Sequence, residues 1–343
     1  MKSIVVAVIA TLCVMLPMKS DGSVCGGPAE GDEPFTGDLT FSITVEGTQR
    51  RYVVHVPEGY TSERRWPVVI MFHGGGGNAR AAMRETRWTE TADREGFLAV
   101  FPEGTPRDPS RRASFLGNPQ TWNDGSRRSN LGAVQQQVPD VKYTAAMLSD
   151  LDRRFRLDKR RIYATGFSNG ASMTFRLARE LSAVWAAVAP VAGSDWMPET
   201  VPKRAVPLLY ITGTADPLNP IDGGEIRIGR KSYGTKPSTE DMIDAWIHIH
   251  GCRTSPVIIH DSANARIAAF THADGSKAVL LCTLDGHGHH WPGGRSLLPA
   301  FLAGEDKSPI DATEVIWGFF RSQVLPERKY SIPREEGKEE WKQ

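Results

Sequence analysis

The stretch Ile162–Met173 reads Ile-Tyr-Ala-Thr-Gly-Phe-Ser-Asn-Gly-Ala-Ser-Met. The residues before Gly166 are β-branched, aromatic and small, which is typical of a buried strand. The residues after Gly170, up to about Leu181, have the spacing of a helix. The stretch therefore predicts a strand, a sharp turn that carries Ser168 at its tip, and a helix.

Steric reasons require glycine at positions 166 and 170. A serine in so tight a turn has a strained backbone, and side chains two residues before and after it would collide with the neighbouring strand and helix. The turn would expose the serine hydroxyl at the carboxyl end of a sheet, near the N–H groups of the following helix. Because glycine and serine are common, Gly-x-Ser-x-Gly is also compatible with a turn that has no catalytic role.

Length and charge limit the possible functions. The chain has 343 residues, enough for one large α/β domain or two small ones. Its formal net charge is +1, so the overall electrostatic field gives no reason to expect a nucleic-acid partner.

The N-terminus predicts export. Lys2 precedes an apolar run, residues 4–16, which only Thr11 interrupts. Such a run is too short to span a bilayer and has the length of a signal-peptide core. We expect residues 1–24 to be a signal peptide and the start of a lead-in, and the protein to be secreted or periplasmic, without a membrane span. A buried N-terminal strand is the alternative, as is lipid anchoring at Cys25, for which Gly-Ser-Val is a poor preceding sequence.

Three cysteines follow the signal segment: Cys25, Cys252 and Cys282. In an oxidising compartment two of them could form a disulfide. Cys252 follows an expected helix and Cys282 lies on a late strand, so a bridge between these two is our first expectation. The third cysteine stays unexplained.

Strand and helix patterns alternate along the chain. Strands are expected at residues 40–45, 51–56, 66–72, 97–101, 161–164, 185–192, 206–212, 265–271 and 278–284, and helices at 79–95, 141–156, 171–181, 238–250 and 311–323. This alternation predicts an α/β fold with a mostly parallel sheet covered by helices on both faces. We expect one domain over residues 25–323 and a charged tail over 324–343. The gap between the strands at 185 and 206 is too short for a cap domain, so the polar loop 102–139 should shape an open site.

A serine nucleophile needs a base, and the base needs an orienting acid. Asp216 comes directly after a buried strand, as the acid should, although it could instead form a turn before Pro217. Asp222 is the second candidate. For the base, the last strand leads into a loop that contains His287, His289 and His290.

Three histidines in four residues also suggest a metal site, but no carboxylate or thiol set with ligand spacing accompanies them. We therefore expect no metal and no cofactor. The oxyanion would be bound by backbone N–H groups. We expect these from Asn169, after the serine, and from Gly75 and Gly76 in the glycine run 74–77. A phosphate-binding loop is the alternative for that run, but the Gly-Lys-Ser/Thr motif is absent.

Five motifs in order make the pattern specific: His73-Gly-Gly-Gly-Gly-Asn78, Trp122-Asn-Asp-Gly125, Gly166-Phe-Ser-Asn-Gly170, Gly213-Thr-Ala-Asp-Pro217 and Gly288-His-His-Trp-Pro-Gly293. The set resembles the secreted esterase family that includes polyhydroxybutyrate depolymerases, feruloyl esterases and acetylxylan esterases. The resemblance covers about residues 25–323. It implies an α/β-hydrolase fold and, by position, His289 as the base.

The chain departs from that family at three places. Pro139-Asp140 stands where the family often has two aspartates, and Gly170-Ala171 where it often has two glycines. His287 replaces a small residue, and could compete with His289 as a proton acceptor.

These observations predict a serine carboxylic-ester hydrolase that acts through an acyl-enzyme on Ser168, with His289 and Asp216. The expected substrates are feruloyl or acetyl esters of plant polysaccharides, with hydroxyalkanoate oligomers as the alternative. Trp122, Asn123 and Trp291 are the expected substrate contacts, although tryptophans are also ordinary core residues. A non-catalytic polymer-binding protein and an acyltransferase are further possibilities. We expect a monomer, whose partner is the ester substrate.

Overall fold

The computed structural model describes residues 35–228, 231–296 and 298–326. The expected signal segment at residues 1–24, Cys25 and residues 327–343 of the expected tail lie outside the described residues. The domain boundaries at residues 25 and 323 therefore stay predictions.

Ten strands form one sheet among the described residues. In spatial order they are β1 (Gly37–Val45), β2 (Thr48–Val56), β4 (Leu98–Pro102), β3 (Trp66–Phe72), β7 (Leu157–Phe167), β8 (Ala187–Val191), β9 (Leu208–Gly213), β14 (Lys277–Leu284), β13 (Ala265–Thr271) and β12 (Val257–Asp261). The strands from β4 to β14 run parallel, and antiparallel strands complete both edges. The predicted, mostly parallel sheet is confirmed.

The central strands are apolar throughout because both faces of the sheet are covered. In β3 every residue is buried, and side chains alternate between the two faces. Val68, Ile70 and Phe72 join one core, whereas Val69 and Met71 join the other.

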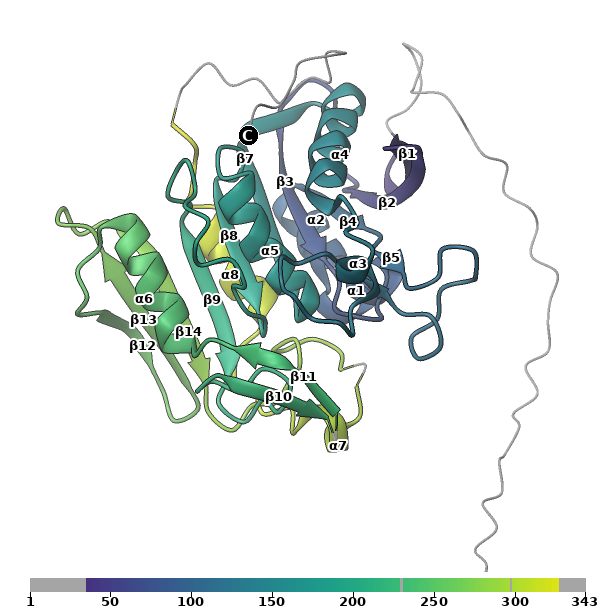
Figure 1. Cartoon of the computed structure of the whole chain (residues 1–343). Coiled ribbons are helices and arrows are strands. Elements are labelled where there is room, and N and C mark those ends of the chain that lie inside the picture. Colours follow the sequence, from purple (N-terminus) through teal and green to yellow (C-terminus); the bar gives the residue numbers. More distant parts are fainter. Residues whose placement is uncertain (1–34, 229–230, 297, 327–343) are drawn as a thin grey trace, which may run out of the picture. The chain divides into compact units, whose positions relative to one another are not determined.

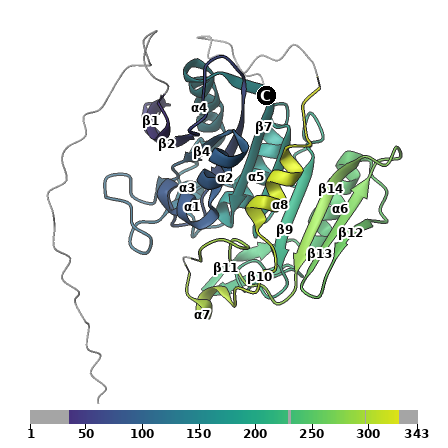
Figure 2. The same ribbon diagram turned by 180° about the vertical axis from the view of Figure 1, so that it is seen from behind.

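Helices cover each face. The first core contains residues of α4 (Asp140–Arg154), α5 (Asn169–Glu180) and α6 (Thr239–His250), which lie in front of the sheet in Figure 1. The second core contains residues of α1 (Ala79–Thr86), α2 (Trp88–Glu95) and α8 (Ala312–Phe320), which Figure 2 shows from the opposite side. Two short helices, α3 (Gly132–Gln135) and α7 (Ala300–Ala303), lie in loops.

The helix predicted over residues 79–95 is two helices. Arg87 separates α1 from α2 in a left-handed conformation with φ 57°. The break lets Trp88 enter the second core, where it packs against Phe97 and Phe320. Helical periodicity continues across the break, so the pattern could not reveal it.

No helix or strand lies within residues 192–207, so no cap domain is inserted after β8, as predicted. A feature that we did not predict follows β9. It is an antiparallel hairpin of β10 (Gly224–Ile228) and β11 (Lys231–Lys236), which lies beside α7 in both views (Figures 1 and 2). A second short ribbon, β5 (Thr105–Pro106) and β6 (Gln120–Thr121), organises the loop 102–139.

The expected Cys252–Cys282 disulfide is wrong for this structure, in which both cysteines are free. Cys282 is buried in the second core, whereas Cys252 packs against the first. The sheet lies between them, so their sulfur atoms cannot meet.

The part of the chain that the structure describes contains no helix with the length and hydrophobicity needed to cross a bilayer.

Two glycines let the serine turn pack against the sheet. A Cβ on Gly166 would lie 2.3 Å from the carbonyl oxygen of Gly170. A Cβ on Gly170 would lie 2.1 Å from the carbonyl oxygen of Phe72, on the neighbouring β3. Backbone atoms of the central sheet cannot yield by this much, so α5 can begin at this point only if both positions lack side chains.

We predict that Gly170→Ala destabilises the protein by at least about 2 kcal/mol, because the methyl group overlaps the backbone of β3. The matched control is Gly318→Ala in α8, where no atom lies within 4 Å of the added Cβ. That change should stabilise the helix by about 0.5–1 kcal/mol. Denaturant midpoints measure both effects. A Gly170→Ala protein as stable as the parent would contradict the packing described here.

Candidate active site

Ser168 occupies the turn between β7 and α5 with φ 54° and ψ −118°, a conformation that non-glycine residues rarely adopt. Hydrogen bonds on both sides hold it there. The N–H of Ser168 donates to the carbonyl oxygen of Val191 at 2.9 Å, and its own carbonyl oxygen accepts from the N–H of Ser172 at 3.0 Å. Ser168 is partly exposed.

Asp216 follows β9 and is buried, with 3% of its surface exposed. Its Oδ1 atom accepts hydrogen bonds from the N–H groups of Leu218 and Asn219, both at 2.8 Å. These bonds stabilise the carboxylate and fix the direction of its second oxygen. Asp222, the alternative acid, is exposed.

His289 joins the acid to the serine. Its Nδ1 atom lies 2.7 Å from Oδ2 of Asp216, and its Nε2 atom lies 2.8 Å from Oγ of Ser168. Since a carboxylate can only accept, Nδ1 carries the proton, which leaves Nε2 free to accept the serine proton. Ser168, Asp216 and His289, which sequence analysis selected from distant motifs, are therefore brought into one hydrogen-bonded chain.

The other two histidines of the loop point to different partners. Nδ1 of His287 accepts from the N–H of Lys307 at 3.2 Å, and its Nε2 lies 3.3 Å from the carbonyl oxygen of His290. Burial lowers the pKa of His287, which favours the neutral ring. Nε2 of His290 donates to the carbonyl oxygen of Gly304. His287 is thus occupied away from Ser168 and does not compete for its proton.

These bonds also bear on metal binding. The three rings do not converge, and the described residues contain no group of three or more histidine, cysteine or acidic side chains that could hold a metal ion.

Asn169 begins α5, so its N–H has no partner within the helix and is available to an oxyanion. The side chain, in contrast, is fully engaged. Its Oδ1 accepts from the N–H of Trp122 at 2.8 Å, and its Nδ2 donates to Asp124 at 2.8 Å. This pairing ties the loop 102–139 to the start of α5.

The glycine run supplies one of the two donors that we expected from it. The N–H of Gly76 donates to the carbonyl oxygen of Gln120 at 2.7 Å, so it is not available, and its expected oxyanion role is wrong for this structure. The N–H of Gly75 has no acceptor among the described residues. A Cβ on Gly75 would lie 3.7 Å from Cβ of Asn169. The two residues whose N–H groups remain available, Gly75 and Asn169, are therefore neighbours in space.

His73 sets the direction of the Gly75 donor, a role that sequence analysis missed. Its Nε2 accepts from the N–H of Gly104 at 3.0 Å, and its Nδ1 donates to the carbonyl oxygen of Gly74 at 2.8 Å. In a trans peptide the C=O and N–H point in opposite directions, so the N–H of Gly75 points away from His73. Burial lowers the pKa of His73 to about 4, which keeps the ring in the neutral form that both bonds require.

Trp122 and Trp291 are core residues, and the expectation that they face the substrate is not met. Trp122 is 0% exposed and donates from Nε1 to the carbonyl oxygen of His73 at 2.9 Å. Trp291 is 1% exposed and donates to Oγ1 of Thr313 at 3.0 Å. Both indoles are therefore packed inside the protein, where they cannot contact a substrate.

Asn123, the third expected substrate contact, is partly buried and its donors are also engaged. Its backbone N–H donates to Asp140 at 2.8 Å, and its Nδ2 donates to the carbonyl oxygen of Val138 at 3.0 Å. Asp140 in turn forms an ion pair of 2.7 Å with Arg50. Asn123 therefore anchors the loop 102–139 to α4 and β2.

Comparison with known proteins places the chain in a family. Residues 50–239 match the family described as esterase PHB depolymerase. The chain belongs to that family. The match includes the glycine run, the loop 102–139, Ser168 and Asp216, and it ends before the loop of His289.

Individual relatives agree with the family. The chain is 28% identical, over 77% of its length, to a protein of Nocardia uniformis subsp. tsuyamanensis that is named as an esterase, NocK, of which it covers 77%. It is 27% identical, over 70% of its length, to feruloyl esterase B of Piromyces equi, of which it covers 42%. An acetyl xylan esterase structure from Aspergillus awamori has the same fold, with a TM-score of 0.50, 13% identity and coverage of 74% of this chain and 95% of that one.

Lys236 is a buried cation near Asp216, and no sequence motif indicates it. It is 2% exposed, and its Nζ donates to the carbonyl oxygen of Pro220 at 2.7 Å. Burial lowers the pKa of Lys236 to about 8, whereas the charges of Asp216 and Asp222 raise it.

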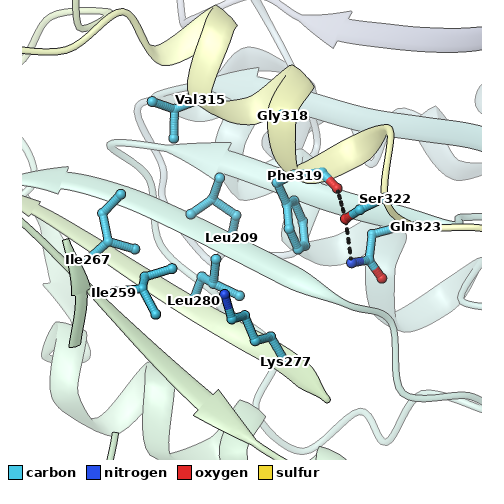
Figure 3. A pocket seen from close by; sticks show the side chains of 10 residues that line it. All are labelled: Leu209, Ile259, Ile267, Lys277, Leu280, Val315, Gly318, Phe319, Ser322 and Gln323. Carbon is cyan, nitrogen blue, oxygen red and sulfur yellow. Dashed lines mark hydrogen bonds between the residues drawn. The ribbon is translucent and has the colours of Figure 1, made fainter. Parts of the chain in front are cut away.

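An apolar cleft of about 260 Å³ lies elsewhere, between α8 and strands β9, β12, β13 and β14. Figure 3 shows that its lining side chains are largely aliphatic, with Leu209, Ile267 and Leu280 on the sheet and Phe319 on the helix. It contains none of Ser168, Asp216 and His289, and Lys277 is the one charged residue among those that line it. The cleft therefore offers no acyl-transfer chemistry.

Glu85 is a buried carboxyl group in α1, beside the loop of His289. Its backbone carbonyl oxygen accepts from the N–H of Arg295 at 2.9 Å. Its side chain is 7% exposed, and burial raises its pKa to about 8. The folded protein therefore retains a proton that the unfolded chain loses above about pH 4.5.

We predict that Glu85→Gln stabilises the protein increasingly as pH rises from 5 to 8. Because the folded-state pKa is raised, the parent loses stability over this interval by up to about 1.4 kcal/mol per pH unit, and glutamine removes that titration. Melting temperatures of the two proteins across the interval measure the difference. Glu90→Gln, at an exposed position of α2, is the control and should show no such trend. A pH-independent difference for Glu85→Gln would refute the assignment.

Proposed function

We propose that this protein is a serine carboxylic-ester hydrolase that works through an acyl-enzyme. Ser168 would be the nucleophile, His289 the general base and Asp216 the residue that orients the base. The observation that carries the proposal is the continuous chain Asp216–His289–Ser168, with bonds of 2.7 and 2.8 Å. Membership of an esterase family supports it independently.

The reaction follows from the geometry. Oγ of Ser168 attacks the ester carbonyl carbon while its proton passes to Nε2 of His289. The negative charge moves to the carbonyl oxygen, which the N–H groups of Asn169 and Gly75 bind. Nε2 then gives its proton to the leaving alcohol, and the acyl group stays on Ser168. Water repeats the sequence and releases the acid, which restores the serine.

The proposed substrates are feruloyl or acetyl esters of plant polysaccharides. Support comes from relatives named feruloyl esterase and acetyl xylan esterase. The family description favours the alternative, a polyhydroxybutyrate oligomer. A panel of methyl ferulate, acetylated xylan and 3-hydroxybutyrate oligomers separates the three. We further propose that the protein is exported, because residues 1–24 have the pattern of a signal peptide.

Two other functions use the same fold. A non-catalytic polymer-binding protein would have no need of the strained serine or of the free N–H groups beside it. An acyltransferase would use the same three residues and transfer the acyl group to an added alcohol or sugar, which product analysis detects.

We predict that Ser168→Ala lowers kcat on 4-nitrophenyl acetate by a factor on the order of 10⁶, because no acyl-enzyme can form. The same change should abolish labelling by a fluorophosphonate probe, which reacts only with an activated serine. Ser255→Ala, at an exposed position far along the chain, is the control and should retain both. A Ser168→Ala enzyme that keeps a tenth of the activity would falsify the assignment.

A further inference from the structure

Two exposed apolar side chains stand on a tight turn of the loop 102–139. Phe115 is 50% exposed and Leu116 is 90% exposed. The turn is closed by a pair of backbone bonds, from the N–H of Ser114 to the carbonyl oxygen of Asn118 at 3.0 Å and in the reverse direction at 3.1 Å. Two neighbouring apolar side chains that an ordered turn leaves exposed to water are candidates for contact with a ligand.

A buried side chain supports this turn from below. Asn118 is 2% exposed, and its Nδ2 donates to three carbonyl oxygens of the preceding segment, those of Asp108, Arg111 and Arg112, at 2.9–3.3 Å. Its Oδ1 accepts from the N–H of Asp108 at 2.8 Å. Phe115 is therefore presented by a structured loop.

The ring of Phe115 lies on the glycine run beside the nucleophile. A Cβ on Gly76 would lie 3.0 Å from Cδ2 and 3.1 Å from Cε2 of Phe115. The bond from the N–H of Gly76 to Gln120 fixes the glycine run to the same loop. The ring is thus one residue away from Gly75, the proposed oxyanion donor.

The direction of the substrate follows from the proposed mechanism. The tetrahedral carbon carries Oγ of Ser168, the oxyanion, the leaving oxygen and the acyl substituent. The oxyanion must face Asn169 and Gly75, and the leaving oxygen must face His289, which protonates it. The acyl substituent takes the remaining direction, away from His289 and at a tetrahedral angle to the oxyanion.

We propose that Phe115, with Leu116 beside it, binds the acyl group of the substrate, and that the enzyme prefers esters of aromatic or longer aliphatic acids to acetyl esters. This inference rests on the proposed function, and it narrows the substrate class. An apolar ring gains little from an acetyl methyl group but shields the larger face of a feruloyl or hexanoyl group from water.

The test keeps the leaving group constant. Values of kcat/KM are measured for the acetate, hexanoate and ferulate esters of 4-nitrophenol. The parent enzyme should favour the two larger acyl groups, and Phe115→Ala should lower the hexanoate-to-acetate and ferulate-to-acetate ratios about tenfold. Phe115→Leu, which retains an apolar side chain, should restore most of the hexanoate ratio.

The matched control is Phe301→Ala. Phe301 is 85% exposed on α7, whose Ala303 carbonyl oxygen accepts from the N–H of His289, so it lies on the leaving-group side. This change should leave both ratios unaltered. Ratios that stay constant in Phe115→Ala, or a parent enzyme that favours acetate, would overturn the proposal for Phe115.

The outcomes separate this inference from the function on which it rests. A parent protein that the fluorophosphonate probe does not label, and that hydrolyses none of the three esters, refutes the hydrolase itself. A parent protein that is labelled and active, with ratios insensitive to Phe115, refutes only the acyl contact.

Discussion

The positive φ angle of Ser168 is the constraint on which the site depends. A non-glycine residue at φ 54° is strained by about 1–3 kcal/mol, so its surroundings must hold it there. They do so through the end of β8, whose Val191 accepts its N–H, and through glycines that let α5 begin against β3. The turn presents the hydroxyl at the end of β7, and α5 begins directly after it, so the N–H of Asn169 has no partner within the helix. The proposed nucleophile and a proposed oxyanion donor are thus adjacent residues of one turn.

Backbone contacts also position Asp216 and His289, the proposed acid and base. The N–H of Thr214 donates to the carbonyl oxygen of Leu284, and that of Ala215 donates to His287. A Cβ on Gly213 would lie 2.1 Å from the His287 carbonyl oxygen, so the two loops run in close contact. Because Asp216 and His289 lie on loops that are hydrogen-bonded to each other, the backbone holds the two side chains within hydrogen-bond distance. Burial of both side chains keeps water from weakening their hydrogen bond.

Sequence analysis predicted the sheet and selected Ser168, Asp216 and His289 because these follow from local patterns. β3 is a continuous apolar run, Ser168 directly follows β7, and Asp216 and His289 lie in the loops after β9 and β14. What it missed depends on contacts between distant segments. Whether Gly75 or Gly76 offers a free N–H is decided by the carbonyl oxygen of Gln120, which no pattern in the glycine run reveals.

The remaining errors have the same origin. Trp122 and Trp291 have hydrogen-bond partners inside the protein, so their burial leaves no indole N–H without an acceptor. These partners come from other parts of the chain, which the local sequence does not reveal. The two cysteines read as a pair in the sequence, but the sheet separates them. The hairpin β10–β11, which contains the buried Lys236, lies in a segment where polar and apolar residues alternate only briefly. We did not recognise this alternation as a strand pattern.

The hydrogen bonds of Asn118 have a consequence for how such enzymes diversify. All four stay within the loop that carries Phe115, and none reaches the strands that bear the reacting residues. The tip of that loop can therefore accumulate substitutions while the chemistry beneath it is preserved. Substitutions at a few exposed positions could therefore change which esters are accepted, and the packed core would stay the same.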